Sequence, residues 1–197
     1  MKKSFIPLYF AAFILLSCNS SSSKKESIDP ELYSVYLKKG EDMANLAQSV
    51  LLSNVGRAIQ KGGLEYAVEF CNINASEIID SLNQSNDCII SRVSEKNRNP
   101  LNIIVNDEVK GLWNFYADKE INTVNDTIIQ LAGNLVFYKP IWIGMPTCLK
   151  CHGVIGEEMD IRTHEKIQNL YPADLATGYK LNDFRGMWKI EFEPLTD

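Results

Sequence analysis

Large apolar side chains recur every three to four residues over residues 30–63 and again over residues 64–82. Residues three and four apart share one face of an α-helix, so this spacing predicts two amphipathic helices in succession. The first begins at Asp29-Pro30, an N-cap residue followed by a proline in the first helical position. Gly40 is a point at which this helix could bend, and the pair Gly62-Gly63 ends it.

The rest of the chain has the pattern of short strands with one further helix. Residues 88–93 form a β-branched run bounded by polar residues, and residues 127–130 and 133–143 flank turn residues as two paired strands would. Apolar and charged side chains alternate over residues 188–192, which predicts a closing strand. Helical spacing returns over residues 106–119. Helices first and hairpin-spaced strands afterwards predict an α+β domain with an antiparallel sheet.

The N-terminus has the pattern of an export signal. Two lysines precede an apolar run too short to span a membrane comfortably, so we interpret residues 1–17 as a lipoprotein signal peptide. The end of that run resembles the lipobox of bacterial lipoproteins, and we expect lipid on Cys18 to anchor a periplasm-facing protein to the cell envelope. A free or disulfide-bonded cysteine is the alternative. Residues 18–29 are typical of a disordered tether, which leaves residues 30–197 as the folded domain.

Composition and charge narrow the choice of partners. The chain of 197 residues has a formal net charge of −5, and 45% of its residues are hydrophobic. Loss of the signal would leave 18 basic against 25 acidic residues, a charge of −7. This length is typical of one domain with its own core. Because the chain has no Lys/Arg-rich stripe, nucleic acid is not expected as a partner.

The segment Cys148-Leu149-Lys150-Cys151-His152 carries the clearest chemical motif. C-x-x-C-H is the attachment motif of c-type haem, in which each thiol adds across a porphyrin vinyl group and the histidine becomes an axial iron ligand. Two intervening residues let one turn of chain present both sulfurs to neighbouring pyrrole edges. The sequence therefore predicts one covalent haem c, held by Cys148 and Cys151 with His152 on the iron.

Three other uses of this motif compete with haem. A structural zinc site would need a second ligand pair, whereas the remaining candidates, Cys71, Cys88 and His164, are isolated in the sequence. A redox C-x-x-C normally begins a helix after a strand in a βαβ unit, and the sequence has no such pattern. A structural disulfide could form outside the cytoplasm, but it gives no reason for His152.

The spacing of the motif leaves the second axial ligand open. Methionine, histidine, cysteine thiolate or a vacant position are the physical options. Cys71 lies on the apolar stripe of the second helix and could reach the iron, although a free buried cysteine is usually a small hydrophobic residue. His164 has polar neighbours, which is typical of a surface histidine. Met145 and Met159 flank the motif and could serve in a conventional cytochrome, although packing is the commoner role of such residues.

Five segments occur in an order that resembles a known family. They are residues 69–72, the R-x-S-x-K-x-R-N-P-x-N stretch at 92–102, the C-x-x-C-H-G segment at 148–153, residues 171–179, and D-F-R-G-M-W at 183–188. Over residues 40–192 the set resembles the small exported haem c domains of PAS-like fold, which occur alone or as sensory parts of bacterial signalling proteins. The resemblance implies a PAS-like antiparallel sheet, with His152 as the proximal ligand and Cys71 as the distal ligand.

Basic residues of the second segment are candidates for binding the haem propionates. Arg92, Lys96 and Arg98 could pair with these carboxylates, since charge-assisted hydrogen bonds favour such clusters. A solvated basic turn is the alternative.

Two functions follow from a His/Cys-ligated haem. A thiolate ligand favours ferric iron and a low potential, and six-coordinate iron leaves no position for peroxidase chemistry, so an enzyme is not expected. The first function is sensing of redox state, or of a diatomic such as CO or NO after release of Cys71, with a separate protein as the signalling partner. The second is simple electron transfer between partners in the cell envelope.

Overall fold

The computed structural model describes residues 28–121 and 123–192, so Cys18, the expected signal peptide and most of the tether lie outside the described residues. In chain order the elements are α1 (Pro30–Gln84), β1 (Cys88–Val93), η1 (Pro100–Asn102), α2 (Asp107–Ala117), β2 (Thr127–Leu131), β3 (Asn134–Trp142), α3 (Pro146–His152), α4 (Ile161–Leu170) and β4 (Phe184–Phe192). None of the helices in these ranges combines the length and the apolar character that a membrane crossing requires.

The four strands form one antiparallel sheet in the order β1-β4-β3-β2. β4 lies between β1 and β3 and pairs with both, so that Ile190 stands opposite Ile90 on one side and Phe137 on the other. β2 and β3 form a hairpin around Ala132 and Gly133, which both have positive φ, as tight hairpin turns require. The predicted α+β architecture with an antiparallel sheet is confirmed.

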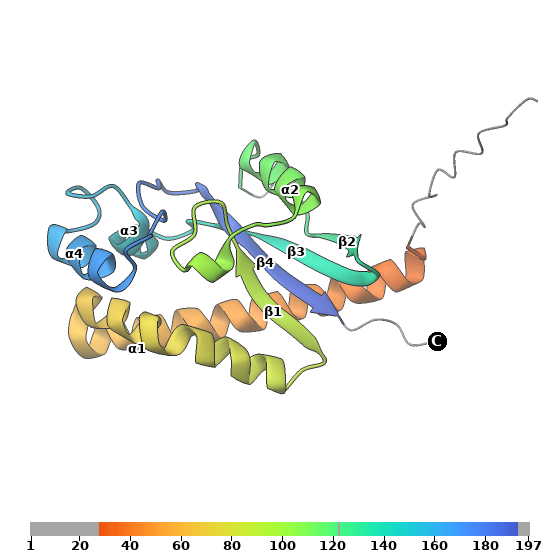
Figure 1. Ribbon diagram of the computed structural model, residues 1–197, viewed down its shortest axis with the longest axis horizontal. Coiled ribbons are helices and arrows are strands. Elements are labelled where there is room, and N and C mark those ends of the chain that lie inside the picture. The colour runs from red at the N-terminus through yellow and green to blue at the C-terminus, as the bar shows by residue number, and fades with distance from the viewer. Residues whose placement is uncertain (1–27, 122, 193–197) are drawn as a thin grey trace, which may run out of the picture.

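α1 is a helical hairpin, which Figure 1 shows as two long segments joined at a sharp turn. The backbone leaves helical geometry at Gly62-Gly63, as the sequence predicts, and Gly63 has φ +76° and ψ −169°, a combination that is essentially restricted to glycine. The bend expected at Gly40 is absent, because Gly40 keeps helical backbone angles. Gly40 instead lets the helix approach the ring of Phe137, which a Cβ at this position would strike.

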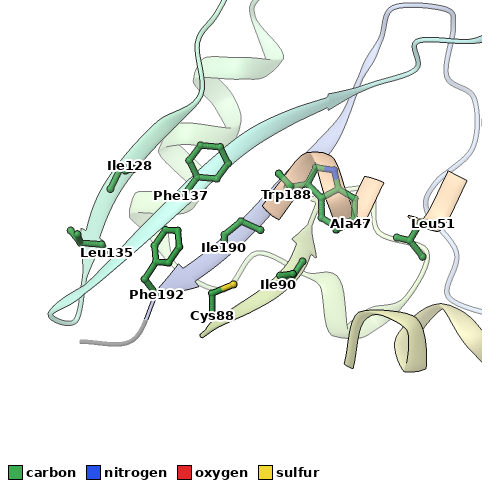
Figure 2. Packing of buried hydrophobic residues seen from close by; sticks show 11 residues of the cluster. Ala47, Leu51, Cys88, Ile90, Ile128, Leu135, Phe137, Trp188, Ile190 and Phe192 are labelled. Carbon is green, nitrogen blue, oxygen red and sulfur yellow. The ribbon is translucent and has the colours of Figure 1, made fainter. Parts of the chain in front are cut away.

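Helices cover both faces of the sheet (Figure 1). The first half of α1 lies on one face, where Figure 2 shows Ala47 by Trp188 of β4. Leu51, Phe137 and Ile190 belong to the same cluster. α2 covers the other face. Its buried residues pack against inward-facing residues of β3 and β4, and the cluster comprises Ile104, Val109, Trp113, Tyr116, Val136, Tyr138 and Met187. Alternation along β3 and β4 therefore supplies both cores.

α3 and α4 lie at the end of the molecule where α1 turns (Figure 1). α4 packs on the second half of α1, where Lys166 Nζ pairs with Glu69 Oε2 at 2.8 Å. Neither α3 nor α4 is among the helices predicted from the sequence. The first turn of α4 is fixed by Asp160, whose Oδ1 accepts the Thr163 N–H at 2.9 Å and whose Oδ2 accepts the Thr163 hydroxyl at 2.9 Å. This end of the molecule carries the C-x-x-C-H motif.

Candidate functional site

The C-x-x-C-H motif forms α3, with both cysteines on one side of the helix because they are three residues apart. Cys148 packs beside a small buried cluster that includes Leu149 from the same helix. Cys151 packs beside a second cluster that includes Val68 of α1 and Met159. Both cysteines are free, and as residues they are partly exposed. Each of the two therefore stands beside its own small apolar cluster.

The side chain of His152 is oriented by one hydrogen bond. Its Nδ1 lies 2.7 Å from the carbonyl oxygen of Ala176. Because a carbonyl only accepts, Nδ1 must carry the proton and donate it, which leaves Nε2 with a free lone pair. Burial, together with the charges of Arg98 and Arg185, holds the pKa of His152 well below its usual range. His152 is therefore neutral near neutral pH and is set up as a metal ligand through Nε2.

Cys71 approaches α3 from the second half of α1. It lies one turn after Val68, which packs in the same cluster as Cys151. Burial raises the pKa of the Cys71 thiol, and the positive charges of Arg92 and Arg98 oppose this rise. Burial also raises the pKa of Cys151 to about 11, and Cys71 adds to that rise. Cys71 and the motif, 80 positions apart in the sequence, are thus brought within electrostatic range of each other.

Arg98 is bound to the protein at several points. Its Nε and Nη2 pair with the two carboxylate oxygens of Asp174 at 3.1 and 3.2 Å. Nη2 also donates to the carbonyls of Cys151 at 2.7 Å and of Ala176 at 3.3 Å. Arg98 therefore connects the end of α3 to Ala176, the residue whose carbonyl accepts the hydrogen bond from His152.

Two other guanidinium groups have no carboxylate partner among the described residues. The Arg92 guanidinium lies over the ring of Trp188, with its Cζ 5.6 Å from the ring centroid, and makes no hydrogen bond or ion pair within the described ranges. Arg185 Nη1 donates at 2.9 Å each to the Ser94 hydroxyl and to the carbonyl of Lys96, which are neutral acceptors. Burial lowers the pKa of both arginines. Because buried cations are costly without a counter-charge, this region fits an anionic group.

Comparison with known proteins places the chain in a family. Residues 14–192 match the family model described as Tll0287-like. The chain belongs to the Tll0287-like family. Among solved structures it resembles the cyanobacterial haem protein Tll0287, with 18% identity and a TM-score of 0.59 over 86% of this chain and 98% of that one. This likeness supports the fold. No curated protein matches the sequence. The family membership predicted from the five segments is confirmed.

Tyr179 of this Tll0287-like chain lies beside His152 and has a role that the sequence alone does not assign. Tyr179 is buried, stands edge-on to the His152 ring at 6.3 Å between centroids, and donates its N–H to the His152 carbonyl at 2.9 Å. Lys96, a predicted propionate contact, lies 4.1 Å above the Tyr179 ring and donates to the Thr177 carbonyl. Tyr179 and Arg185 both stand inside the segments quoted for the family resemblance, which was the only signal for them.

The remaining candidate ligands of the Tll0287-like domain are placed as follows. Met159 is fully buried in the cluster beside Cys151, whereas Met145 is 45% exposed. Cys88 is buried in the sheet core. His164 is partly exposed, and its enclosed Nδ1 has no hydrogen-bond partner within the described residues. Among the described residues, no group of three or more His, Cys, Asp or Glu side chains could hold a bare metal ion.

Proposed function

We propose that the chain binds one haem c, attached through thioethers to Cys148 and Cys151, with His152 and Cys71 as the axial ligands. The observation that carries this proposal is the hydrogen bond from His152 Nδ1 to the Ala176 carbonyl, which leaves Nε2 available on the residue that follows the two free cysteines of the motif. Similarity to a solved haem protein supports the same reading. The position of Cys71 near the motif supports it as the distal ligand.

The arginines around His152 suit the two propionates that haem carries. Arg92, predicted from the sequence, fits this role because it lacks a carboxylate partner among the described residues. Arg98, also predicted, is occupied through Nε and Nη2 by Asp174 and two carbonyls, so it would contribute mainly by its charge. Arg185 is a third candidate, since its described acceptors are neutral. Charge-assisted bonds to carboxylates are the strongest that these groups can form.

Bound haem would supply a one-electron iron couple, and a thiolate ligand would favour its ferric state. The protein's own contribution is to hold His152 in one orientation and to present Cys71 from a helix. Because Cys71 belongs to the helix that follows the turn at Gly62-Gly63, a shift of that helix would change its distance from α3. This arrangement favours a lipid-anchored sensor of redox state or of a diatomic ligand in the cell envelope.

Electron transfer is the second candidate function. Cys148, Cys151 and His152 are each partly exposed, and α3 presents Thr147 and Lys150 to solvent. A haem attached there would have an edge near the surface, where a redox partner could approach. Addition of CO or NO to the reduced protein separates the two functions. A shift of the Soret band supports the sensor, and an unchanged band with rapid electron exchange supports the carrier.

Mass spectrometry and spectroscopy of protein made in cells that assemble c-type cytochromes test the haem site. We expect the mass of one haem on the wild type and its loss in the Cys148→Ser/Cys151→Ser variant. Cys71→Ala should abolish the low-spin ferric signals of thiolate ligation, whereas Cys88→Ala, in the sheet core, should keep them. A wild-type chain without added haem mass would refute the proposal, and unchanged signals in Cys71→Ala would refute the distal ligand.

Lipid anchoring is tested separately at Cys18. We propose that the mature chain begins at this cysteine and is held by acyl chains, each buried methylene contributing about 0.8 kcal/mol to membrane binding. The expected result is a lipidated N-terminal peptide and recovery of the protein in the membrane fraction. Cys18→Ser should shift the protein to the soluble fraction. An unlipidated wild-type peptide would contradict this anchoring.

A further inference from the structure

A buried ion pair between Arg98 and Asp174 lies close to His152, the proposed iron ligand. Arg98 and Asp174 meet through two bonds, Nε to Oδ1 at 3.1 Å and Nη2 to Oδ2 at 3.2 Å. The Asp174 side chain is completely buried, and that of Arg98 is 15% exposed. Parallel contacts of this kind fix the plane of both groups, because the guanidinium fork matches the carboxylate.

The ion pair restrains the Ala176 peptide, whose carbonyl accepts the hydrogen bond from His152 Nδ1. Asp174 Oδ1 accepts the Ala176 N–H at 2.9 Å, while the Ala176 carbonyl accepts from Arg98 Nη2 at 3.3 Å and from His152 Nδ1 at 2.7 Å. Arg98 Nη2 also donates to the carbonyl of Cys151, the residue before His152, at 2.7 Å. The pair therefore restrains both the backbone that carries His152 and the acceptor that orients its ring.

We propose that Arg98 and Asp174 are positioning residues that set the orientation of the His152 imidazole toward the haem iron. The inference rests on the proposed haem function and adds a role for two residues that do not touch the iron. The group that accepts the second ring N–H of a metal-bound histidine fixes the plane and the tautomer of the ring, so residues that hold this acceptor in place act on the ligand. A ligand plane that is held at one angle gives one low-spin ferric species.

Two substitutions remove the restraint while leaving most of the packing in place. Asp174→Asn keeps the shape of the side chain but removes its charge. Arg98→Lys keeps a positive charge but cannot bridge the carboxylate and two carbonyls at once, because an ammonium lacks the planar fork. In either variant the Ala176 carbonyl is less firmly held, and His152 gains access to further orientations.

Electron paramagnetic resonance of the ferric holoprotein tests the inference. We expect one low-spin species in the wild type, and two or more, or one markedly broadened species, in Asp174→Asn and in Arg98→Lys. The double variant should resemble the single variants, since all three break the same connection. A reductive titration should follow a one-electron curve in the wild type and spread over a wider potential range in the variants.

The matched control is Asp126→Asn. It breaks another partly buried ion pair, from Lys139 Nζ to Asp126 Oδ2 at 2.8 Å, which joins the segment before β2 to β3. This variant should lose stability but keep the single wild-type species. Haem mass is measured on every sample, so absence of haem from the wild type would count against the proposed function. Folded, haem-loaded Asp174→Asn and Arg98→Lys proteins with wild-type resonance and titration curves would overturn the positioning role.

Discussion

Two glycines of α1 have opposite surroundings. A Cβ at Gly40 would strike the Phe137 ring in the sheet core, whereas a Cβ at Gly56 would meet nothing within 4 Å. We expect Gly40→Ala to destabilise the fold by about 1–3 kcal/mol, because an overpacked core must shift. Gly56→Ala should stabilise it by about 0.5–1 kcal/mol through helix propensity. Urea unfolding of both variants checks the signs, and equal effects would show that the packing at Phe137 is not limiting.

Glu191 of β4 gives stability a dependence on pH. Its side chain accepts from Lys189 Nζ and from Asn134 Nδ2, each at 2.8 Å, and these bonds hold its pKa below the ordinary value of 4.5. A carboxyl with a lowered folded pKa contributes stability that is present above its unfolded pKa and is lost as pH falls through the folded pKa.

The substitution that tests this contribution is Glu191→Gln. The variant should be less stable than the wild type near pH 7, and the difference should shrink as pH falls below the ordinary glutamate pKa of 4.5 and then through the lower folded pKa. Chemical unfolding at several pH values measures it. Parallel stability curves from neutral to acid pH would exclude a role for the Glu191 charge.

The roles of residues at the candidate site can be predicted from the sequence only where the residues that act together are neighbours in the chain. Cys148, Cys151 and His152 are adjacent, so their spacing alone predicts their joint use. Asp174 bonds to Arg98, and Arg98 donates to the Cys151 carbonyl, although these three residues lie far apart along the chain. Such a network leaves no regular spacing in the sequence, so its members can be recognised only once the fold is known.

At the scale of elements, the start of α4 depends on one side chain. Asp160 accepts both the N–H and the hydroxyl of Thr163, and these bonds lower the pKa of its carboxyl. Asp160→Ala should cost about 1 kcal/mol, as the loss of an N-cap usually does, whereas Asp160→Asn keeps an acceptor and should cost less. Thermal unfolding compares the two. If both variants lose the same stability, the charge of Asp160 and not its capping hydrogen bonds would be the cause.

The elements differ in how clearly the sequence predicts them. The α1 hairpin, α2 and the strands follow from the recurrence of apolar side chains and from the glycine pair, because these elements supply most of the buried residues on the two faces of the sheet. α4 is short and mostly polar, and its buried side reduces to Thr163 and Ile167. The sequence pattern that indicates α4 is an N-cap residue, Asp160, followed by Ile167 and Leu170 at helical spacing. This pattern is weak because only two apolar residues carry it.

For the molecule as a whole, the candidate site draws on α1, the segment after β1, α3 and the chain between α4 and β4. Its two apolar clusters are small, whereas larger clusters lie on the two faces of the sheet. Regions with few buried contacts open more easily than the main core. The haem proposed here would therefore contribute most of its stabilisation at the α3–α4 end.

Hydrogen exchange measures this distribution in the Cys148→Ser/Cys151→Ser variant. We expect amide exchange over residues 146–152 and 171–179 to quicken by about tenfold or more relative to the haem-loaded wild type, while β3 and β4 change little. Uniform acceleration across the sheet would instead show that the cofactor and the whole fold are one cooperative unit.

The sheet order has a consequence for biogenesis. β4 follows the other three strands in the chain, yet it separates β1 from the β2–β3 hairpin and supplies Trp188 and Ile190 to the core. A ribosome releases the strands in sequence, so β1 and β3 emerge with the edges that β4 will cover still unpaired. A nascent chain that has not yet reached residue 184 would hold two disconnected pieces of sheet. Chaperones and proteases would recognise these exposed edges until β4 is synthesised.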